Sequence, residues 1–384
     1  MIESELDDLF DQADAAADAG EAWTAALLYE RAHQLAAEYG YQEDALYALQ
    51  RGATCWRLTS EFDRGLTLLL EAMHQPRFHG DEEHRYWLQN LFVTQALDYG
   101  VHVTSIDDQI ELLSSLAVAV WGAEGSNTLY RRSQLLSDRG HWQAALDVLE
   151  QAWVHRADAG PTGRLSAITY QASAVCLHLA RRKDAERWMT QLDASEDQFD
   201  DHWSRAKHRA DLAFFDNDAR SARSACRQID ALVPSQQADL PMYATLYAVH
   251  ALLLDPAEGD PASAAHLARV RMNNDASALA SMPWELYNWH HSVACLELAS
   301  VRYGAGMLPV DDVFYQRTQV LPPPEEARLP ADIARRLATF ERACATALKH
   351  ARTEDSHYGS SRHEEEVARI HQRGTAIGAV FRRP

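Results

Sequence analysis

The hydrophobic positions of this chain recur at intervals of three and four residues over most of its length. That spacing places apolar side chains on one face of a helix, whereas the alternation typical of a half-buried strand is almost absent. Turn and breaker residues interrupt the pattern regularly, for example at Gly40, Gly100, Gly140 and Pro234. The segments between them are about 12–20 residues long, the length of ordinary helices. The pattern therefore predicts an all-α protein.

A second pattern repeats inside these helices. A turn residue is followed five residues later by a small residue, then by a larger apolar residue, and then by another small one. The pattern is clearest in Gly20–Ala25–Tyr29–Ala32, Ser60–Gly65–Leu69–Ala72 and Gly140–Ala145–Leu149–Ala152, and it recurs with larger last members in Ala180–Ala185–Met189–Leu192 and Asn217–Ala222–Cys226–Ile229. A small side chain lets two helices approach closely, because the distance between helix axes depends on the side chains at the contact. Each such helix is therefore expected to be the second of a packed pair.

The small positions Ala25, Gly65, Ala145 and Ala185 fit a period of about 40, with one interval of twice that length. A divergent helix pair at 81–98 and 107–121 is expected to fill the longer interval. The small–large–small pattern resembles that of tetratricopeptide repeats, although the Trp-Leu-Gly-Tyr pattern of their first helix is mostly missing. The long period is similar to that of the repeats in bacterial transcriptional activators and Rap-type peptide-sensing regulators. The resemblance covers about residues 5–305 and implies a right-handed α-solenoid of stacked antiparallel helix pairs.

The pattern changes after Tyr303. We expect the repeat array at 1–305, a Pro-rich irregular connection at 306–330, capping helices at 331–373 and a flexible tail at 374–384. Three consecutive prolines from Pro322 cannot continue a helix. The segment 331–352 returns as a helix that caps the array, 353–361 is expected to be a flexible link, and 362–372 a last helix.

The composition of the chain disfavours several classes of function. The formal charge of −20 disfavours nucleic-acid binding, because the basic clusters are too short to form a stripe along a phosphate backbone. No apolar run approaches the ~20 residues that span a bilayer. The acidic N-terminus lacks the basic region of a signal peptide, so we expect a soluble cytoplasmic protein. Only three of the 36 basic residues are lysine, a bias that indicates a GC-rich, bacterial coding sequence.

We find no motif for catalysis, for a cofactor or for a metal. The five cysteines are far apart and lie on apolar faces, which favours buried thiols. HExxH, the serine elbow and the phosphate-binding glycine motifs do not occur. The paired carboxylates are typical of helix starts, where they interact with the helix dipole. The remaining enzymatic hypothesis is an unrecognised site around Glu285, His290 and His291.

The tetratricopeptide resemblance also implies a binding surface, because certain positions of each first helix line a concave groove in that family. Amides, tyrosines and scattered basic groups suit the binding of an extended peptide backbone. The alternative is that these positions are only the solvent-facing sides of the first helices. The candidate partner-binding residues are Tyr47, Gln50, Arg57, Asn90, Asn127, Tyr130, Gln134, Tyr170, Lys207, Asn288 and His291.

The leading hypothesis is a cytoplasmic scaffold or adaptor that binds another protein or a peptide segment and needs no cofactor. A second is a regulatory sensor for a signalling peptide or small molecule, and a third is the enzyme mentioned above. The C-terminal helix 331–352 is a candidate surface for pairing two copies of the chain.

Overall fold

The structure, a computed structural model, describes residues 2–57, 59, 61–74, 81–97, 103–157, 165–194, 202–216, 218–232, 283–304 and 331–381. These residues contain helices and turns but no strand. The chain divides into two compact units: unit 1 comprises Met1–Arg131 with two short later segments, and unit 2 comprises most of the rest.

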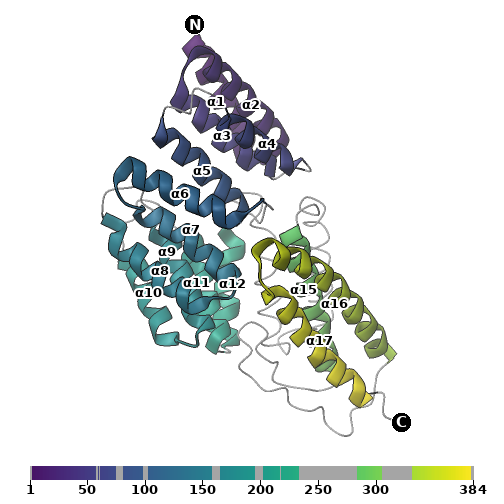
Figure 1. Cartoon of the computed structure of the whole chain (residues 1–384). Coiled ribbons are helices and arrows are strands. Elements are labelled where there is room, and N and C mark those ends of the chain that lie inside the picture. The colour runs from purple at the N-terminus through teal and green to yellow at the C-terminus, as the bar shows by residue number, and fades with distance from the viewer. Residues whose placement is uncertain are drawn as a thin grey trace. The chain divides into compact units, whose positions relative to one another are not determined.

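Unit 1 consists of antiparallel helix pairs in chain order (Figure 1). The helices are α1 (Ile2–Asp18), α2 (Ala22–Tyr39), α3 (Gln42–Arg57), α4 (Phe62–Met73), α5 (Glu82–Leu97), α6 (Ile106–Trp121) and the first half of α7 (Gly125–Asp138). From α1 to α6, each helix packs against the next, and α3 also contacts α5. The divergent pair expected between residues 81 and 121 is present as α5 and α6, which confirms that prediction.

Unit 2 contains the end of α7, further helix pairs and a C-terminal helical bundle (Figure 1). The pairs are built from α8 (Trp142–Val154), a short 3-10 turn (His155–Ala157), α9 (Leu165–His178), α10 (Arg182–Ala194), α11 (His202–Asp216) and α12 (Ala219–Leu232). The bundle is built from α15 (Pro283–Gly304), α16 (Ala331–Tyr358) and α17 (Arg362–Phe381). Within the pairs, α9 contacts both its partner α10 and the next first helix, α11. The described part of each unit therefore has the predicted architecture of stacked antiparallel helix pairs.

The small residues of the repeat pattern are buried where helices touch. Ala25, Ala145, Ala185 and Ala222 are fully buried. At Gly65 a Cβ would lie 3.0 Å from the backbone of Ala53 on the preceding helix, so only glycine fits without a shift. The predicted small contact positions of these second helices are confirmed.

Before α2, α8 and α10 the turn residue of the repeat pattern has a left-handed backbone, whereas Ser60 and Asn217 lie outside the described residues. Gly20 and Gly140 have φ values of +77° and +74°, and Ala180 takes the same position with φ +58°. In each turn the following N–H closes the preceding helix, as His141 does on the Leu136 carbonyl (2.8 Å) and Arg181 on the Cys176 carbonyl (2.8 Å). The chain therefore reverses direction by the same hydrogen bond at each of these repeats.

The C-terminal helices are longer than the sequence indicated. The segment 353–361 was expected to be a flexible link, but α16 continues to Tyr358, because Glu354, Asp355 and Tyr358 are buried. A frayed tail was expected from Gly374, but α17 continues to Phe381. Gly374 lies inside the helix because the ring of Phe340 occupies the space where a Cβ would be. The expected Pro-rich connection at 306–330 lies outside the described residues.

Candidate functional site

The candidate site lies between α3 and α5, two first helices of unit 1. The helix α3 begins just after Gly40, whose left-handed backbone ends α2. The helix α5 begins at a cap, because the Asp81 carboxylate accepts the backbone N–H groups of Glu83 and His84 at 3.1 Å. Both helices carry acidic residues in their first turn, where the helix dipole stabilises negative charge.

A pocket of about 480 Å³ opens between these two helices. Its lining residues are Glu43, Leu46, Tyr47 and Gln50 from α3, and Glu83, His84, Trp87, Asn90 and Leu91 from α5. Leu46 and Leu91 belong to the apolar core between α3, α4 and α5, so they give the pocket an apolar floor. Three of the candidate residues, Tyr47, Gln50 and Asn90, are brought together here.

The two helices present the same series of side chains to the pocket. On α3 a carboxylate is followed by an aromatic residue four positions later and an amide three positions after that, and α5 has the same series at the equivalent positions of the next repeat. The series are Glu43–Tyr47–Gln50 and Glu83–Trp87–Asn90. Residues at these spacings lie on one face of a helix, one turn apart. Neither glutamate was among the candidate residues, although the recurrence of this series one repeat later was a signal in the sequence that could have identified them.

Most polar groups in the pocket have no partner in the described part of the chain. The side chains of Glu43, Gln50 and Glu83 make no hydrogen bond or ion pair there, and neither do the Tyr47 hydroxyl and the Trp87 indole N–H. His84 differs, because its ring contacts the Asp81 carboxylate. These five groups around one pocket have donors and acceptors that an external molecule can use, and a pocket with a few convergent polar groups is the usual form of a binding site.

Beneath the pocket, a buried network joins α5 to α7. The Asn127 side-chain amide donates to Asn90 Oδ1 and to the Tyr86 hydroxyl, both at 2.8 Å. The Tyr86 hydroxyl also lies 3.4 Å from Thr128 Oγ1, and burial raises the pKa of Tyr86. Asn127 was expected to face the groove, but it is buried and holds α7 against α5. Its contribution to the site is to fix Asn90.

The candidate residues Tyr130 and Gln134 are not among those that line the pocket between α3 and α5. The guanidinium of Arg131 lies 5.3 Å from the ring centroid of Tyr130. Gln134 is half-buried on α7 within unit 2, and the side chain of Arg57 lies outside the described residues.

In unit 2 the expected residues contact one another. Lys207 Nζ on α11 lies 4.3 Å from the ring centroid of Tyr170 on α9, and the Tyr170 hydroxyl donates to Asp211 at 3.2 Å. The Gln171 amide donates to Ser137 Oγ of α7 at 2.9 Å. These polar groups tie neighbouring first helices together, so they are engaged within the fold.

Asn288 and His291 lie on α15, in the C-terminal bundle. The ring of His291 stacks on that of Tyr287, with 5.5 Å between centroids, and the Tyr287 hydroxyl donates to Glu366 at 2.7 Å. Because α15 packs on α16 and α17, the stacked rings of Tyr287 and His291 lie in the C-terminal bundle. They are not part of the surface formed by the first helices of the repeats.

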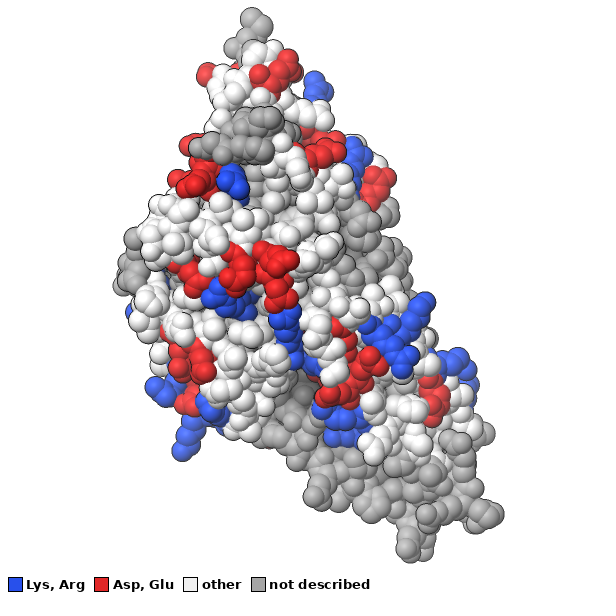
Figure 2. Space-filling model, in the orientation of Figure 1, with Lys and Arg blue, Asp and Glu red and all other residues white. Residues whose placement is uncertain are grey.

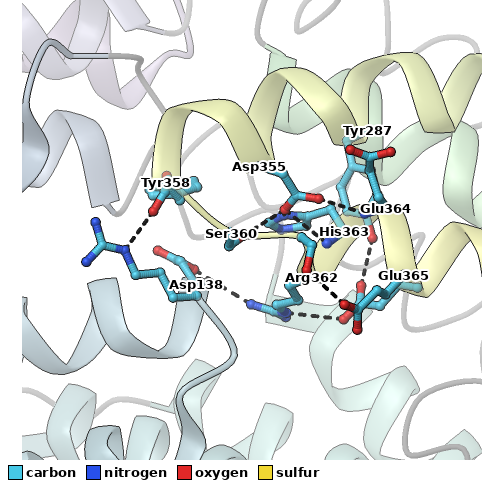
Figure 3. Close-up of polar contacts among 12 residues, drawn as sticks. Asp138, Tyr287, Asp355, Tyr358, Ser360, Arg362, His363, Glu364 and Glu365 are labelled. Atoms are coloured by element: carbon cyan, nitrogen blue, oxygen red, sulfur yellow. Dashed lines mark hydrogen bonds and ion pairs between the residues drawn. The ribbon is translucent and has the colours of Figure 1, made fainter.

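A polar network holds the tip of the α16–α17 hairpin against α7 and α8 (Figure 3). Arg139 Nε donates to the Tyr358 carbonyl at 2.6 Å, and Arg362 donates to the Ser137 carbonyl at 3.0 Å. The Arg362 guanidinium also lies 4.7 Å from the ring centroid of Trp142. Arg362 also forms ion pairs with Asp138 (3.9 Å) and Glu366 (3.2 Å), so the network contributes to stability.

Within that tip, Asp355 caps α17. Its carboxylate accepts the backbone N–H groups of His363 (3.1 Å) and Glu364 (2.8 Å) and the Ser360 hydroxyl (2.8 Å). Burial alone would raise the pKa of Asp355, but hydrogen bonds from His363, Glu364 and Ser360 outweigh it and hold the pKa at about 2. The cap is therefore fully ionised at neutral pH.

Two kinds of reactive group, metal ligands and thiols, can be assessed among the described residues. No group of three or more His, Cys, Asp or Glu side chains among them could hold a metal ion. All five cysteines are free and buried, and burial raises the pKa of Cys176 and of Cys344 to about 12, which disfavours the reactive thiolate. Among the described helices, none has the length and apolar character needed to cross a membrane.

Comparisons with known proteins find matches among solved structures alone. No protein-family model matches the chain, and no curated protein matches it. Among solved structures, the chain is similar to a Rap protein complexed with competence and sporulation factor. The sequence identity is 11%, the match covers 88% of this chain and 98% of that chain, and the TM-score is 0.40. A likeness this distant transfers neither a ligand nor an activity to the present chain.

Proposed function

We propose that the chain is a binding scaffold that holds an extended peptide or protein segment in the pocket between α3 and α5, and that it carries out no chemistry of its own. One observation carries the proposal: five polar groups that make no hydrogen bond or ion pair with the described residues, and two aromatic rings, converge there from two repeats in the same order along each helix.

The chemistry of the pocket suits a peptide. The amides of Gln50 and Asn90 both donate and accept hydrogen bonds, as a peptide backbone requires. Tyr47 and Trp87 offer large contact areas and lose little side-chain entropy on binding. The apolar floor of Leu46 and Leu91 can receive an aliphatic side chain. Together these groups match the mixed composition of interfaces that bind peptides.

The exposure of the pocket favours a peptide over a small molecule. Its volume of about 480 Å³ falls within the range of small-ligand sites, but such sites bury about 70–90% of their ligand. Here Glu43 and Gln50 are exposed, and 43% of Tyr47 remains accessible. An open surface of this kind contacts one side of an extended chain.

Peptide selection tests the proposal directly. The full-length protein is immobilised and presented with a phage library of random heptapeptides, and the selected peptides are synthesised for affinity measurements. We expect Tyr47→Ala and Trp87→Ala each to weaken these peptides by about tenfold or more, because aromatic anchors dominate binding energy. Tyr39→Ala is the matched control, since Tyr39 is a half-exposed tyrosine of α2 outside the pocket. Equal affinities for all three variants, with unchanged circular dichroism, would contradict the proposal.

The same pocket could serve an adaptor or a regulatory sensor. A sensor must change conformation on binding, because a ligand shifts an equilibrium only through different affinities for two states. Small-angle scattering with and without a selected peptide distinguishes them. An unchanged radius of gyration is expected for an adaptor, and a change for a sensor.

A further inference from the structure

Negative charge is concentrated in the part of the chain that forms the pocket. Residues 1–131 contain 23 acidic and 7 basic residues, a formal charge of −16, whereas the whole chain carries −20. Figure 2 shows scattered groups of acidic side chains, with fewer basic ones, in the part in which Figure 1 places α1 to α5. A surface of one sign raises the local concentration of partners with the opposite charge. The field of this unit therefore favours a basic partner.

The pocket has two carboxylates at equivalent repeat positions. Glu43 and Glu83 lie in the first turns of α3 and α5, and both side chains line the pocket. Neither carboxylate has a hydrogen bond or ion pair within the described residues. Since two unpaired carboxylates beside one pocket repel each other, a cation between them relieves that repulsion.

Each carboxylate has an aromatic ring one turn further along its own helix. Tyr47 follows Glu43 by four residues, and Trp87 follows Glu83 by four. Aromatic faces attract cations, and a guanidinium can stack on a ring while its N–H groups donate to a carboxylate. The combination therefore suits an arginine better than the compact ammonium of lysine, although both are cations.

From this arrangement we infer that the bound segment presents a basic side chain, arginine in preference to lysine, with its cation between Glu43 and Glu83 and against the rings of Tyr47 and Trp87. The inference rests on the proposed peptide-binding function and adds the chemical class of the anchoring residue. The amide end of the pocket, at Gln50 and Asn90, then binds the neighbouring backbone.

The heptapeptide selection also tests this inference. We expect the peptides selected by the wild-type chain to be enriched in arginine over the starting library. In synthetic peptides, replacing that arginine by the uncharged isostere citrulline should weaken binding by about tenfold or more, and added salt should weaken the arginine form alone.

Charge-neutral variants provide the matched comparison. The double variant Glu43→Gln/Glu83→Gln should lose the preference for arginine over citrulline. The control Glu38→Gln/Glu82→Gln removes the same charge from exposed positions of α2 and α5 that do not line the pocket, and it should keep the preference. An equal loss in both double variants would mean that the general charge of the unit, and not the pocket, selects arginine, and would overturn the inference.

The outcomes separate this inference from the proposed function. Peptides that depend on Tyr47 and Trp87 but show no arginine enrichment, or tolerate citrulline, would overturn the inference and leave the peptide-binding proposal in place. A failure to select any pocket-dependent peptide would overturn both.

Discussion

Tyr47 and Trp87 occupy the same position of two successive first helices, and both face one pocket. The equivalence extends one turn towards the N-terminus to a carboxylate and one turn towards the C-terminus to an amide. A repeating helix pair thus places equal chemistry on neighbouring parallel helices. The pocket is a consequence of the repeat. Its two walls come from different repeats, so the side chains of α3 and of α5 can be substituted separately.

Gln50 and Asn127 should respond oppositely to removal of the side chain. Gln50 is exposed and has no described partner, so Gln50→Ala should weaken a selected peptide and leave stability within about 0.5 kcal/mol of wild type. Asn127→Ala removes hydrogen bonds to Asn90 and to the buried Tyr86 hydroxyl, and should cost about 1–3 kcal/mol of unfolding free energy. Urea unfolding and peptide titration measure the two effects. A stable Asn127→Ala variant would show that the network contributes nothing to folding.

The pair Ala144 and Ala145 tests the register of the second helices. Ala145 is fully buried, whereas its neighbour Ala144 is exposed on the other side of α8. Ala145→Arg introduces volume and an unpaired charge between packed helices and should cost about 3 kcal/mol or more. Ala144→Arg should change the melting temperature little, because its side chain extends into solvent. Thermal unfolding followed by circular dichroism checks both variants, and similar melting temperatures would refute the register.

Features that depend on residues close together in the sequence could be predicted, whereas features that depend on contacts between different helices could not. The second-helix pattern is local, so Ala25 and Ala145 could be identified as contact positions from spacing alone. The end of α17 was missed because Gly374 reads as a helix stop, and only the ring of Phe340, on the preceding helix α16, explains a glycine inside the helix. At the proposed site, the repeat register places Tyr47 and Gln50 on one face of α3, whereas Asn90 was assigned only by its comparable helix face. The burial of Asn127 was not predictable, since it depends on Tyr86 of another helix.

Ala180 provides a test of backbone strain. It takes the left-handed conformation (φ +58°) that glycine provides at the equivalent Gly20 and Gly140. The left-handed conformation costs alanine about 1–2 kcal/mol relative to glycine. Glycine removes this strain from the folded state, but it also increases the conformational entropy of the unfolded chain, which offsets part of the gain in stability. Ala180→Gly should therefore stabilise the protein by about 0.5–1 kcal/mol in urea unfolding, and Gly140→Ala should destabilise it by a similar amount. A destabilised Ala180→Gly variant would mean that the turn is not strained.

Asp355 should make unit 2 sensitive to strong acid only. Its pKa of about 2 in the folded state lies below the ordinary value near 3.9, so the folded state binds the proton more weakly than the unfolded state. The stabilisation is then complete above about pH 4 and is lost as the pH falls through about 2, and its full size is of order 2–3 kcal/mol.

Asp355→Asn removes the charge at every pH and should abolish this part of the pH dependence. Unfolding free energies measured in urea from pH 6 to pH 2 test the expectation, with Asp11→Asn, an exposed carboxylate in the middle of α1, as the control. The control should follow the wild-type curve, whereas Asp355→Asn should be less stable at pH 6 and approach the wild type near pH 2. Parallel curves for wild type and Asp355→Asn over the whole range would show that the cap is not held by its charge.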